Sequence, residues 1–315
     1  MKDLRFYDFG LNLLHIEHKI ISSNWTTYFN DLGKAEIHLS TNSKAVPLLF
    51  ENKYLIITEG ENQAIVTAKQ IGSKCVIYAK TPNWILSKKL LAPFESVTEN
   101  AETKVREFVA SCFSDCDEFV LGDILGTEET QTFCEESYTP LFDVIKGGLL
   151  PSALGHRVYF DIPEKKWVFE VIKGTKRDIE ISHSMRTAYD MEYVFDMQNY
   201  YSFAKYKTRT ESGEYAWEST QKDDKSGLYK WETVLFEDAS TDAQRELAKC
   251  REKEEITAKV RSLEYGKDYS LGDTLNIKFE CGDLKIAKKV KIIGINMWCE
   301  AEKEGYEPIF EMVIK

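Results

Sequence analysis

Short runs of alternating apolar and polar residues dominate both ends of the chain. Near the N-terminus they are KYLIITEGENQAIVTAKQI (53–71) and KCVIYAK (74–80), and Gly60-Glu61-Asn62 is a plausible hairpin connection in the first run. Near the C-terminus they are TLNIKF (274–279), LKIAKKVKIIGINMW (284–298) and IFEMVI (309–314). A period of two is typical of half-buried strands, so the pattern predicts that residues 1–88 and 179–315 are β-rich.

The pattern changes between residues 89 and 178. Ser96 and Glu99 fit a capping box ahead of a helix, and Thr139-Pro140 fits the start of a second, shorter helix that stops at Gly147-Gly148. The apolar residues with helical spacing in the first helix are Val97, Ala101, Val105, Phe108 and Cys112. Alternation over 158–162 and 167–171 predicts a hairpin, so this middle segment is predicted to be α/β.

Two features interrupt the second β-rich segment. Residues 208–231 are polar and punctuated by glycine, which predicts a long exposed hairpin or flexible arm. Residues 241–263 predict a helix, because Thr241 and Gln244 fit a capping box and Gly266 fits a stop.

The arm carries four aromatic residues, Tyr215, Trp217, Tyr229 and Trp231. Tyrosine and tryptophan in a polar segment are typical interface anchors, and this is the one set of candidate binding residues. The same residues could instead stabilise only their own hairpin through cross-strand pairs.

Composition narrows the function classes. A chain of 315 residues is long enough for two or three domains, and its net charge of −11 argues against nonspecific binding to nucleic acid or to anionic lipid. No apolar run is long enough for a membrane-spanning helix, so membrane insertion is not expected. The seven cysteines are scattered and include no CxxC pair, which favours reduced thiols in a protein made in the cytoplasm.

No motif indicates catalysis, a metal site or a bound cofactor. The sequence contains no GxxxxGK[ST], GxGxxG, HExxH or GxSxG pattern. Its five histidines, His15, His18, His38, His156 and His183, form no recognisable triad motif. We therefore expect no enzyme activity, although a carboxylate pair assembled only in the folded chain would leave a cell-wall hydrolase as an alternative.

Several stretches, taken in order, resemble the tail-hub or tail-associated family of long-tailed phages and phage-tail-like particles, which is similar to the baseplate hub of contractile phages. The first is SSNWTTYFNDLGKAEIHLS (22–40), in which Trp25, Tyr28, Gly33, Ile37 and Leu39 fit the family pattern. The paired strands Tyr54–Ile71 follow, and then PNWILSKKLLAP leads into ENAETKVREFV. In WVFEVIKGTKRD (167–178) Gly174 and Arg177 fit, but Lys176 stands where the family has an acidic residue. The last stretch is KDYSLGDTLNIKF, with Leu271-Gly272-Asp273.

The resemblance implies a β-rich α+β fold in which two tube-type β-barrel domains, 1–88 and 179–315, flank a small α/β domain at 89–178. The first barrel is expected to borrow strands from beyond the middle domain. Three copies would form a pseudo-sixfold ring that joins the tail tube to the tail tip around a central channel.

The implied partners are the tail tube protein, other baseplate proteins, the tape-measure protein and a separate spike, fibre or lysin. The protein would be made in the cytoplasm of a bacterial host and incorporated into a virion tail or tail-like particle. Two alternatives stay open, a tail-tip peptidoglycan hydrolase and a sixfold distal tail or tube component.

Overall fold

The computed structural model describes residues 3–209, 213–235, 243–300 and 303–313. The chain divides into two compact units, the first made of Met1–Met191 with Ala258–Lys315 and the second of Glu192–Thr257. The second unit is thus an insertion. Strands β16 (Ala188–Asp196) and β20 (Lys253–Val260) pair with each other and cross the boundary between the units.

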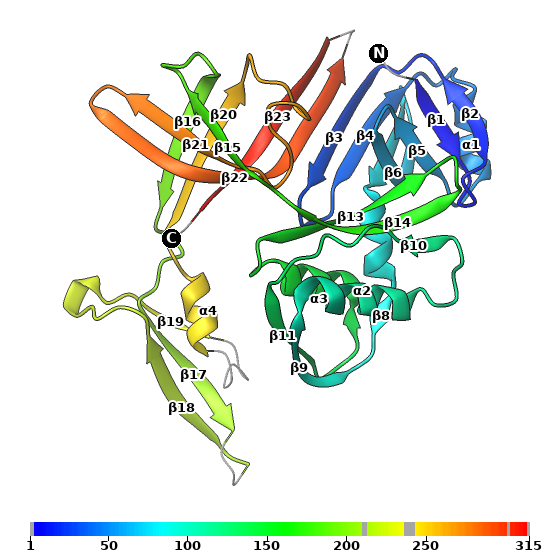
Figure 1. Ribbon diagram of the computed structural model, residues 1–315. Helices are drawn as coiled ribbons and strands as arrows, with labels where there is room; N and C mark the ends of the chain where they lie inside the picture. Colours follow the sequence, from blue (N-terminus) through cyan, green and yellow to red (C-terminus); the bar gives the residue numbers. More distant parts are fainter. Residues whose placement is uncertain (1–2, 210–212, 236–242, 301–302, 314–315) are drawn as a thin grey trace. The chain divides into compact units, whose positions relative to one another are not determined.

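One open sheet organises the first unit (Figure 1). Among the described residues it has eleven strands in the order β15-β21-β22-β3-β4-β7-β6-β5-β1-β2, with β23 pairing β22 beside this path. Among the described residues its strands pair antiparallel, except β15 with β21. The strand bounds are β1 Leu4–Tyr7, β2 Leu13–Glu17, β3 Ser22–Tyr28, β4 Lys34–Leu39, β5 Ile56–Glu59, β6 Asn62–Ile71, β7 Cys75–Lys80, β15 Lys176–Ser182, β21 Thr274–Cys281, β22 Leu284–Glu300 and β23 Lys303–Met312.

Pairing of β22 with β3 joins the two β-rich ends of the chain. The register runs from Gly294 opposite Tyr28 to Glu300 opposite Ser22. An irregularity in the pairing of β22 with β23, between Ile292 and Gly294, adds one residue, so Ile292 and Ile295 are both fully buried although they are three apart. The long strand therefore keeps one apolar face as it passes from β21 to β3.

The chain by itself does not form the two closed barrels expected from the sequence. Within the described residues the path of paired strands ends at β2 on one side and β15 on the other, and these two strands do not pair with each other. The physical reason is the length of β22: its first half pairs with β21 and its second half with β3, so strands from both ends merge into one sheet. The expectation that N-terminal strands borrow a partner from beyond the middle domain agrees with this pairing.

Apolar residues of β1, of β3 to β7 and of helix α1 (Ala45–Glu51) form one core. Trp25, Ile37, Leu39 and Leu49 are among its fully or nearly fully buried members. Because alternate residues of a strand point to opposite faces, the period-two pattern read from the sequence places these side chains together.

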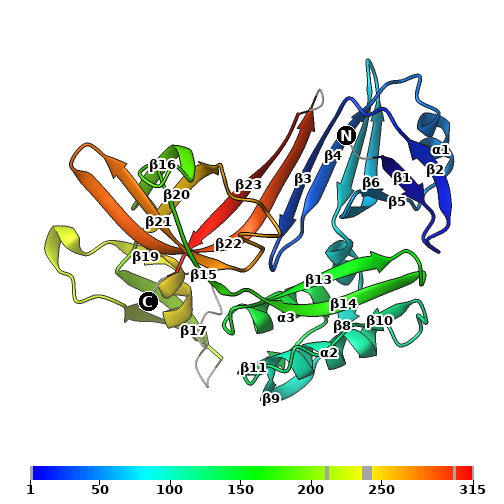
Figure 2. The same cartoon turned by 45° about the horizontal axis from the view of Figure 1, so that its top comes forward.

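A second core belongs to the middle segment and lies among α2, α3 and the β13–β14 hairpin, which Figure 2 shows side by side. The hairpin joins β10 in a three-stranded sheet, and β9–β11 and β8–β12 form two short pairs. The bounds are η1 Pro82–Lys88, β8 Leu90–Leu91, β9 Phe94–Asn100, α2 Ala101–Cys112, β10 Phe119–Leu121, β11 Thr130–Glu135, β12 Thr139–Pro140, α3 Leu141–Leu149, β13 Leu154–Asp161 and β14 Lys166–Lys173.

Two predicted helix boundaries in this segment are wrong. Ser96 and Glu99 lie in β9, which pairs with β11, and Asn100 caps α2 by accepting the N–H of Thr103 at 2.9 Å. Gly147 and Gly148 lie inside α3 instead of beyond it. A Cβ atom on Gly148 would lie 2.2 Å from the ring of Phe133, so this glycine permits close packing of the helix.

The second unit contains a three-stranded sheet in the order β18-β17-β19 and a short helix. The bounds are β17 Phe203–Arg209, β18 Tyr215–Gln221, η2 Gly227–Tyr229, β19 Glu232–Val234 and α4 Ala243–Lys249. The predicted arm 208–231 thus contains β18 and η2, while residues 210–212 lie outside the described residues.

The predicted helix at 241–263 is wrong over most of its length. Only Ala243–Lys249 is helical, Thr241 of the predicted cap lies outside the described residues, and Lys253–Val260 is strand β20. In β20 the buried residues Ile256 and Ala258 alternate with exposed neighbours. A period of two with β-branched residues favours a strand, and pairing with β16 decides the outcome. None of the described helices is long and apolar enough to cross a membrane.

Gly272→Ala should destabilise the first unit far more than Gly282→Ala. Both glycines have positive φ, +85° and +58°, so each substitution should cost about 1–2 kcal/mol of backbone strain. A Cβ on Gly272 would also lie 2.2 Å from Cε2 of Phe29, whereas a Cβ on Gly282 would meet nothing within 4 Å. We expect roughly 1–3 kcal/mol of additional loss for Gly272→Ala, measured by urea unfolding. Equal losses in the two variants would contradict this packing.

Candidate functional site

The ring of Phe29 lies at the meeting point of three segments that are far apart in the sequence. A Cβ on Gly155 would lie 2.9 Å from ring atoms Cδ1 and Cδ2, and one on Gly272 would lie 2.2 Å from Cε2. The ammonium of Lys291 lies 4.1 Å from the ring centroid and donates to the carbonyl of Ala153 at 3.0 Å. Phe29 is therefore held by the middle segment through Gly155 and by the C-terminal strands through Gly272 and Lys291.

Backbone hydrogen bonds fix the same residue from both sides. The N–H of Phe29 donates to the carbonyl of Ile293 at 2.8 Å, and its carbonyl accepts the N–H of His156 at 3.1 Å. Burial lowers the pKa of Lys291, while Glu311 opposes the shift. A lysine kept partly dehydrated against an aromatic face is a strong cation–π partner, so the electrostatic contact adds to the packing.

The buried carboxylate of Asp273 holds the turn that precedes β21 in one conformation. Asp273, 2% exposed, accepts the N–H and hydroxyl of Thr175 at 2.8 and 3.0 Å, Nε of Arg177 at 2.7 Å and the N–H of Ser270 at 2.9 Å. Four donors satisfy a carboxylate that would otherwise be costly to bury. These four hydrogen bonds fix the positions at which β15 and β21 begin.

Gly174 brings the two strands together at this point. A Cβ there would lie 1.8 Å from the carbonyl oxygen of Gly272, so no side chain fits. The structure thus brings Gly174 and Arg177 of one predicted motif against Gly272 and Asp273 of another. Lys176, the departure from the family pattern, lies in the same strand and is exposed.

A polar link joins the middle segment to the N-terminal strands. Asn83 accepts the N–H of Val158 at 2.6 Å, and Asn30 shares a hydrogen bond with Nδ1 of His156 at 2.7 Å. His156 is fully buried between the rings of Phe142 and Phe169, and its Nε2 has no hydrogen-bond partner among the residues that the structure describes. This burial lowers the pKa of His156 to about 3, with Asp31 opposing the shift and Lys146 adding to it.

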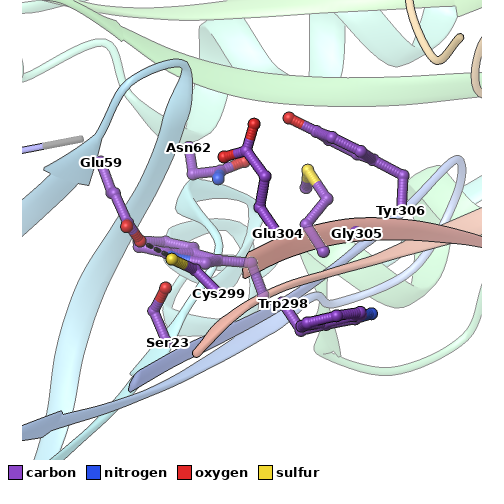
Figure 3. A pocket seen from close by; sticks show the side chains of 10 residues that line it. Ser23, Glu59, Asn62, Trp298, Cys299, Glu304, Gly305 and Tyr306 are labelled. Carbon is purple, nitrogen blue, oxygen red and sulfur yellow. Dashed lines mark hydrogen bonds between the residues drawn. The ribbon is translucent and has the colours of Figure 1, made fainter. Parts of the chain in front are cut away.

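A small pocket opens between β5–β6 and β22–β23 (Figure 3). Its cavity of ≈ 30 Å³ fits about one water molecule and cannot hold a sugar ring. Nε1 of Trp25 donates to Glu59 at 2.6 Å inside it, and burial raises the pKa of the Cys299 thiol. A neutral thiol is a poor nucleophile, so we interpret this pocket as a small gap in the packing beside the paired strands β3 and β22 and not as a catalytic site. Gly305, which a sequence reading would place in a turn, lies in β23 opposite Trp298.

Among the described residues, no group of three or more His, Cys, Asp and Glu side chains could hold a metal ion. His15 and His18 have different surroundings: His15 lies near the ring of Phe6, and His18 contacts Asp3 at 2.8 Å. Cys112 and Cys116 are free and partly buried against the second core.

The four aromatic residues of the predicted arm are all exposed but do not form one cluster. Tyr215 and Trp217 lie two residues apart on β18 and share a face with Lys207 of β17, whose ammonium lies 5.8 and 5.3 Å from their rings. Tyr229 lies in η2 and is 78% exposed. Trp231 packs against the ring of Tyr200.

The other face of this small sheet is covered. Ala204 on that face of β17 and Leu247 of α4, which contacts β17 and β18, are both 0% exposed, whereas Trp217 is 57% exposed. The face with Tyr215 and Trp217 is therefore left to solvent in the single chain.

The two ends of the large sheet present different chemistry. Strand β2 pairs only with β1 in the described part of the chain and exposes Leu13 and Leu14. Strand β15 pairs there only with β21 and begins with Lys176, Arg177 and Asp178. An unpaired edge exposes N–H and C=O groups that can accept a further strand.

Sequence reasoning included Phe29 in an early aromatic stretch but did not identify it as the centre of packing. Gly155 also went unnoticed, although a glycine at the start of a strand such as LGHRVYFD is a signal for close backbone approach. His156 was considered only as a catalytic residue. Its partners come from residues 30, 142 and 169, so no local pattern could reveal its burial.

Three solved phage tail proteins share this fold over nearly the whole chain. The tail protein from Neisseria meningitidis MC58 is 9% identical with a TM-score of 0.59, covering 99% of this chain and 96% of its own. Prophage tail protein gp18 from Listeria monocytogenes EGD-e is 13% identical with a TM-score of 0.57, covering 99% and 95%. The 43 kDa tail protein of prophage MuSo2 from Shewanella oneidensis is 12% identical with a TM-score of 0.56, covering 99% and 98%.

No protein-family model matches the sequence, and no curated protein matches it. The likeness in structure is thus a likeness of fold. It agrees with the β-rich α+β class read from the sequence.

Replacing His156 with Gln should make stability less sensitive to acid. The folded-state pKa is about 3, below the usual value of 6.5, so only the unfolded chain binds this proton between those values. Wild type should therefore lose about 1.4 kcal/mol per pH unit below pH 6.5, or about 2 kcal/mol by pH 5, from this residue. His156→Gln should lack that part of the loss in urea unfolding, while above about pH 7 the two slopes should agree. Identical slopes from pH 7 to 5 would contradict the burial of a neutral imidazole.

Proposed function

We propose that this chain is a structural tail-tip hub, three copies of which form a pseudo-sixfold ring that joins a tail tube to the tip and surrounds a central channel. The observation that carries the proposal is the shared fold. It extends over 99% of this chain and 95–98% of three solved tail proteins, with no large unmatched domain on either side. Hub, trimer and channel go beyond what that likeness shows and rest on the geometry below.

An open sheet with two unlike edges is suited to a ring. If the β2 edge of one copy pairs with the β15 edge of the next, both ends of the strand path in every copy are paired, and β23 beside that path keeps its outer edge. Such a head-to-tail contact closes when the rotation per copy is a whole fraction of a turn. The barrel expected from the sequence is then a property of the assembled ring, to which each copy contributes one sheet.

Pseudo-sixfold character follows from the two halves of that sheet. Residues before 89 supply β1 to β7, and residues after 175 supply β15 and β21 to β23, with the β3–β22 pair between them. Three copies with two halves each would present six similar segments to a hexameric tube. We retain as part of this proposal the division into tube-like domains at 1–88 and 179–315 and a middle domain at 89–178.

The proposed partners are the tail tube protein, other baseplate proteins, the tape-measure protein and a separate spike, fibre or lysin. The net charge of −11 suits a channel along which DNA must move without adhering. In this proposal the chain is made in the cytoplasm of a bacterial host and leaves it inside a virion tail or tail-like particle.

The aromatic face of the inserted unit is the candidate contact to a neighbouring tail protein. Tyr215 and Trp217 are rigid, amphipathic and exposed, which are properties of residues that dominate binding energy at interfaces. Tyr229 is exposed in the same unit and is a further candidate for this contact, whereas Trp231 packs against the ring of Tyr200.

Purified protein should form rings of three copies of the 36.4 kDa chain, seen by native mass and by threefold class averages with an open centre. Leu13→Lys with Leu14→Lys should abolish the rings, because charge on an edge strand blocks strand addition. Leu90→Lys is the matched control, since Leu90 is equally exposed but lies in β8, away from both edges. Circular dichroism and the melting temperature should remain those of wild type in both variants.

A different number of copies in the assembly would favour one of the alternative functions. Six copies would favour a distal tail or tube component. A protein that stays monomeric at high concentration and degrades peptidoglycan would favour the hydrolase.

Tyr215→Ala with Trp217→Ala should leave folding and ring formation unchanged but weaken incorporation into tails by tenfold or more, because interface aromatics each contribute on the order of 2 kcal/mol. The measurement is the amount of this protein in purified particles after complementation. Tyr54→Ala is a control for loss of an exposed tyrosine elsewhere. Normal incorporation of the double variant would show that Tyr215 and Trp217 do not contribute to an interface with another tail protein.

A further inference from the structure

The most acidic segment of the chain carries an apolar tip that is held rigidly in place. Residues 114–136 contain eight carboxylates and no lysine or arginine. At its centre, Ile124 is 73% exposed and Leu125 is 45% exposed. Neither side chain belongs to the core of the middle segment.

A buried carboxylate fixes the backbone of this tip. Glu102, 1% exposed, accepts the N–H groups of Leu125 at 2.5 Å, Gly126 at 2.8 Å and Thr127 at 3.1 Å. Three N–H donors compensate for burying the charge, and in return they hold the loop in one conformation.

Arginine completes the clamp from the other end. The guanidinium of Arg106 donates to the carbonyls of Gly122 at 2.7 Å and Asp123 at 3.0 Å. Asn100 donates to the carbonyl of Thr127. A loop fixed in this way loses little conformational entropy when its exposed side chains bind a partner. We define Asp123–Glu128 as the clamped tip.

The β21–β22 hairpin carries a local excess of positive charge. Residues 274–291 contain five lysines and two carboxylates. Lys285, Ala287 and Lys289 alternate along β22, so they share one face, and all three are exposed. In the described part of the chain Lys285 and Lys289 form no ion pair. We define Lys285, Ala287 and Lys289 as the lysine face.

The tip and the lysine face are complementary. Along a strand, Lys285 and Lys289 are about 14 Å apart with Ala287 between them. The residues opposite them on β21 are Asn276, Lys278 and Glu280, and Glu280 pairs with Lys278, so the face keeps a net positive charge. The clamped tip has the inverse pattern, in which exposed Ile124 and Leu125 lie between the carboxylates of Asp123 and Glu128. Neither Asp123 nor Glu128 has an ion-pair partner within the residues that the structure describes.

We propose that the clamped tip of one copy docks on the lysine face of the next copy in the ring. Ile124 covers Ala287, and Asp123 and Glu128 approach Lys285 and Lys289. The proposal rests on the ring assembly proposed above and names a second contact in it. A head-to-tail ring needs two complementary surfaces on every chain, and charge complementarity between these two identifies a second copy as the occupant.

The test is a charge exchange measured by the trimer dissociation constant. Lys285→Glu with Lys289→Glu should weaken the trimer roughly tenfold or more, because two attractive pairs per contact become repulsive. Adding Asp123→Lys and Glu128→Lys to that variant should restore affinity to within about threefold of wild type. Ile124→Ser alone should weaken the trimer about tenfold through loss of apolar contact.

The control is Lys88→Glu with Lys225→Glu, which changes the net charge equally at two other exposed lysines. It should leave the dissociation constant unchanged. Melting temperatures of all variants verify folding, and the affinity of wild type should fall as salt is added.

The outcomes separate this inference from the ring itself. Wild-type trimers that persist with unchanged affinity in Lys285→Glu/Lys289→Glu would overturn the tip contact and leave the ring intact. Weakening without restoration by the exchange would also overturn it, because the lysines would then face something other than the tip. A wild type that forms no trimer would refute the ring and this contact together.

Discussion

The position of Phe29 is the constraint on which the rest of the first unit depends. Its ring occupies a space that exists only because residues 155 and 272 have no side chain, and its backbone bonds to residues 156 and 293. Three segments that are predicted separately from the sequence are thereby fixed against one another. The buried carboxylate of Asp273 holds the same turn through four hydrogen bonds, so packing and polar pairing support one geometry.

This junction makes two β-rich ends into one sheet. Strand β22 continues past β21 and pairs with β3, and its irregularity at Ile292 keeps the apolar face on one side throughout. Within the described residues, the strand path of this sheet ends at β2 and β15, which its own chain does not pair further. The proposed ring accounts for those edges by pairing neighbours, and it explains why a fold shared with tail proteins needs no closed barrel in each chain.

Local patterns succeeded where the deciding interactions are local. The hairpin predicted from alternation over 158–162 and 167–171 is confirmed, because its alternation and its turn are local, and its strands extend over Leu154–Asp161 and Lys166–Lys173. The helix at 241–263 failed because its apolar residues fit a period of 3.6 as well as a period of two, and only pairing with β16 favours the strand. The exposure of Tyr215 and Trp217 could be anticipated from polar neighbours, but their shared face with Lys207 required the register of β17 and β18.

The sequence by itself determined the β-rich class, the α/β middle segment and many of the strands, because alternation is a property of neighbouring residues. It also supplied the motif residues Gly174, Arg177, Gly272 and Asp273 without showing that they touch. Only the tertiary structure decided that they meet, that β3 pairs with β22, and that the sheet stays open. Each of those outcomes depends on contacts between residues about a hundred or more positions apart, and no local periodicity encodes which distant strand will supply the partner.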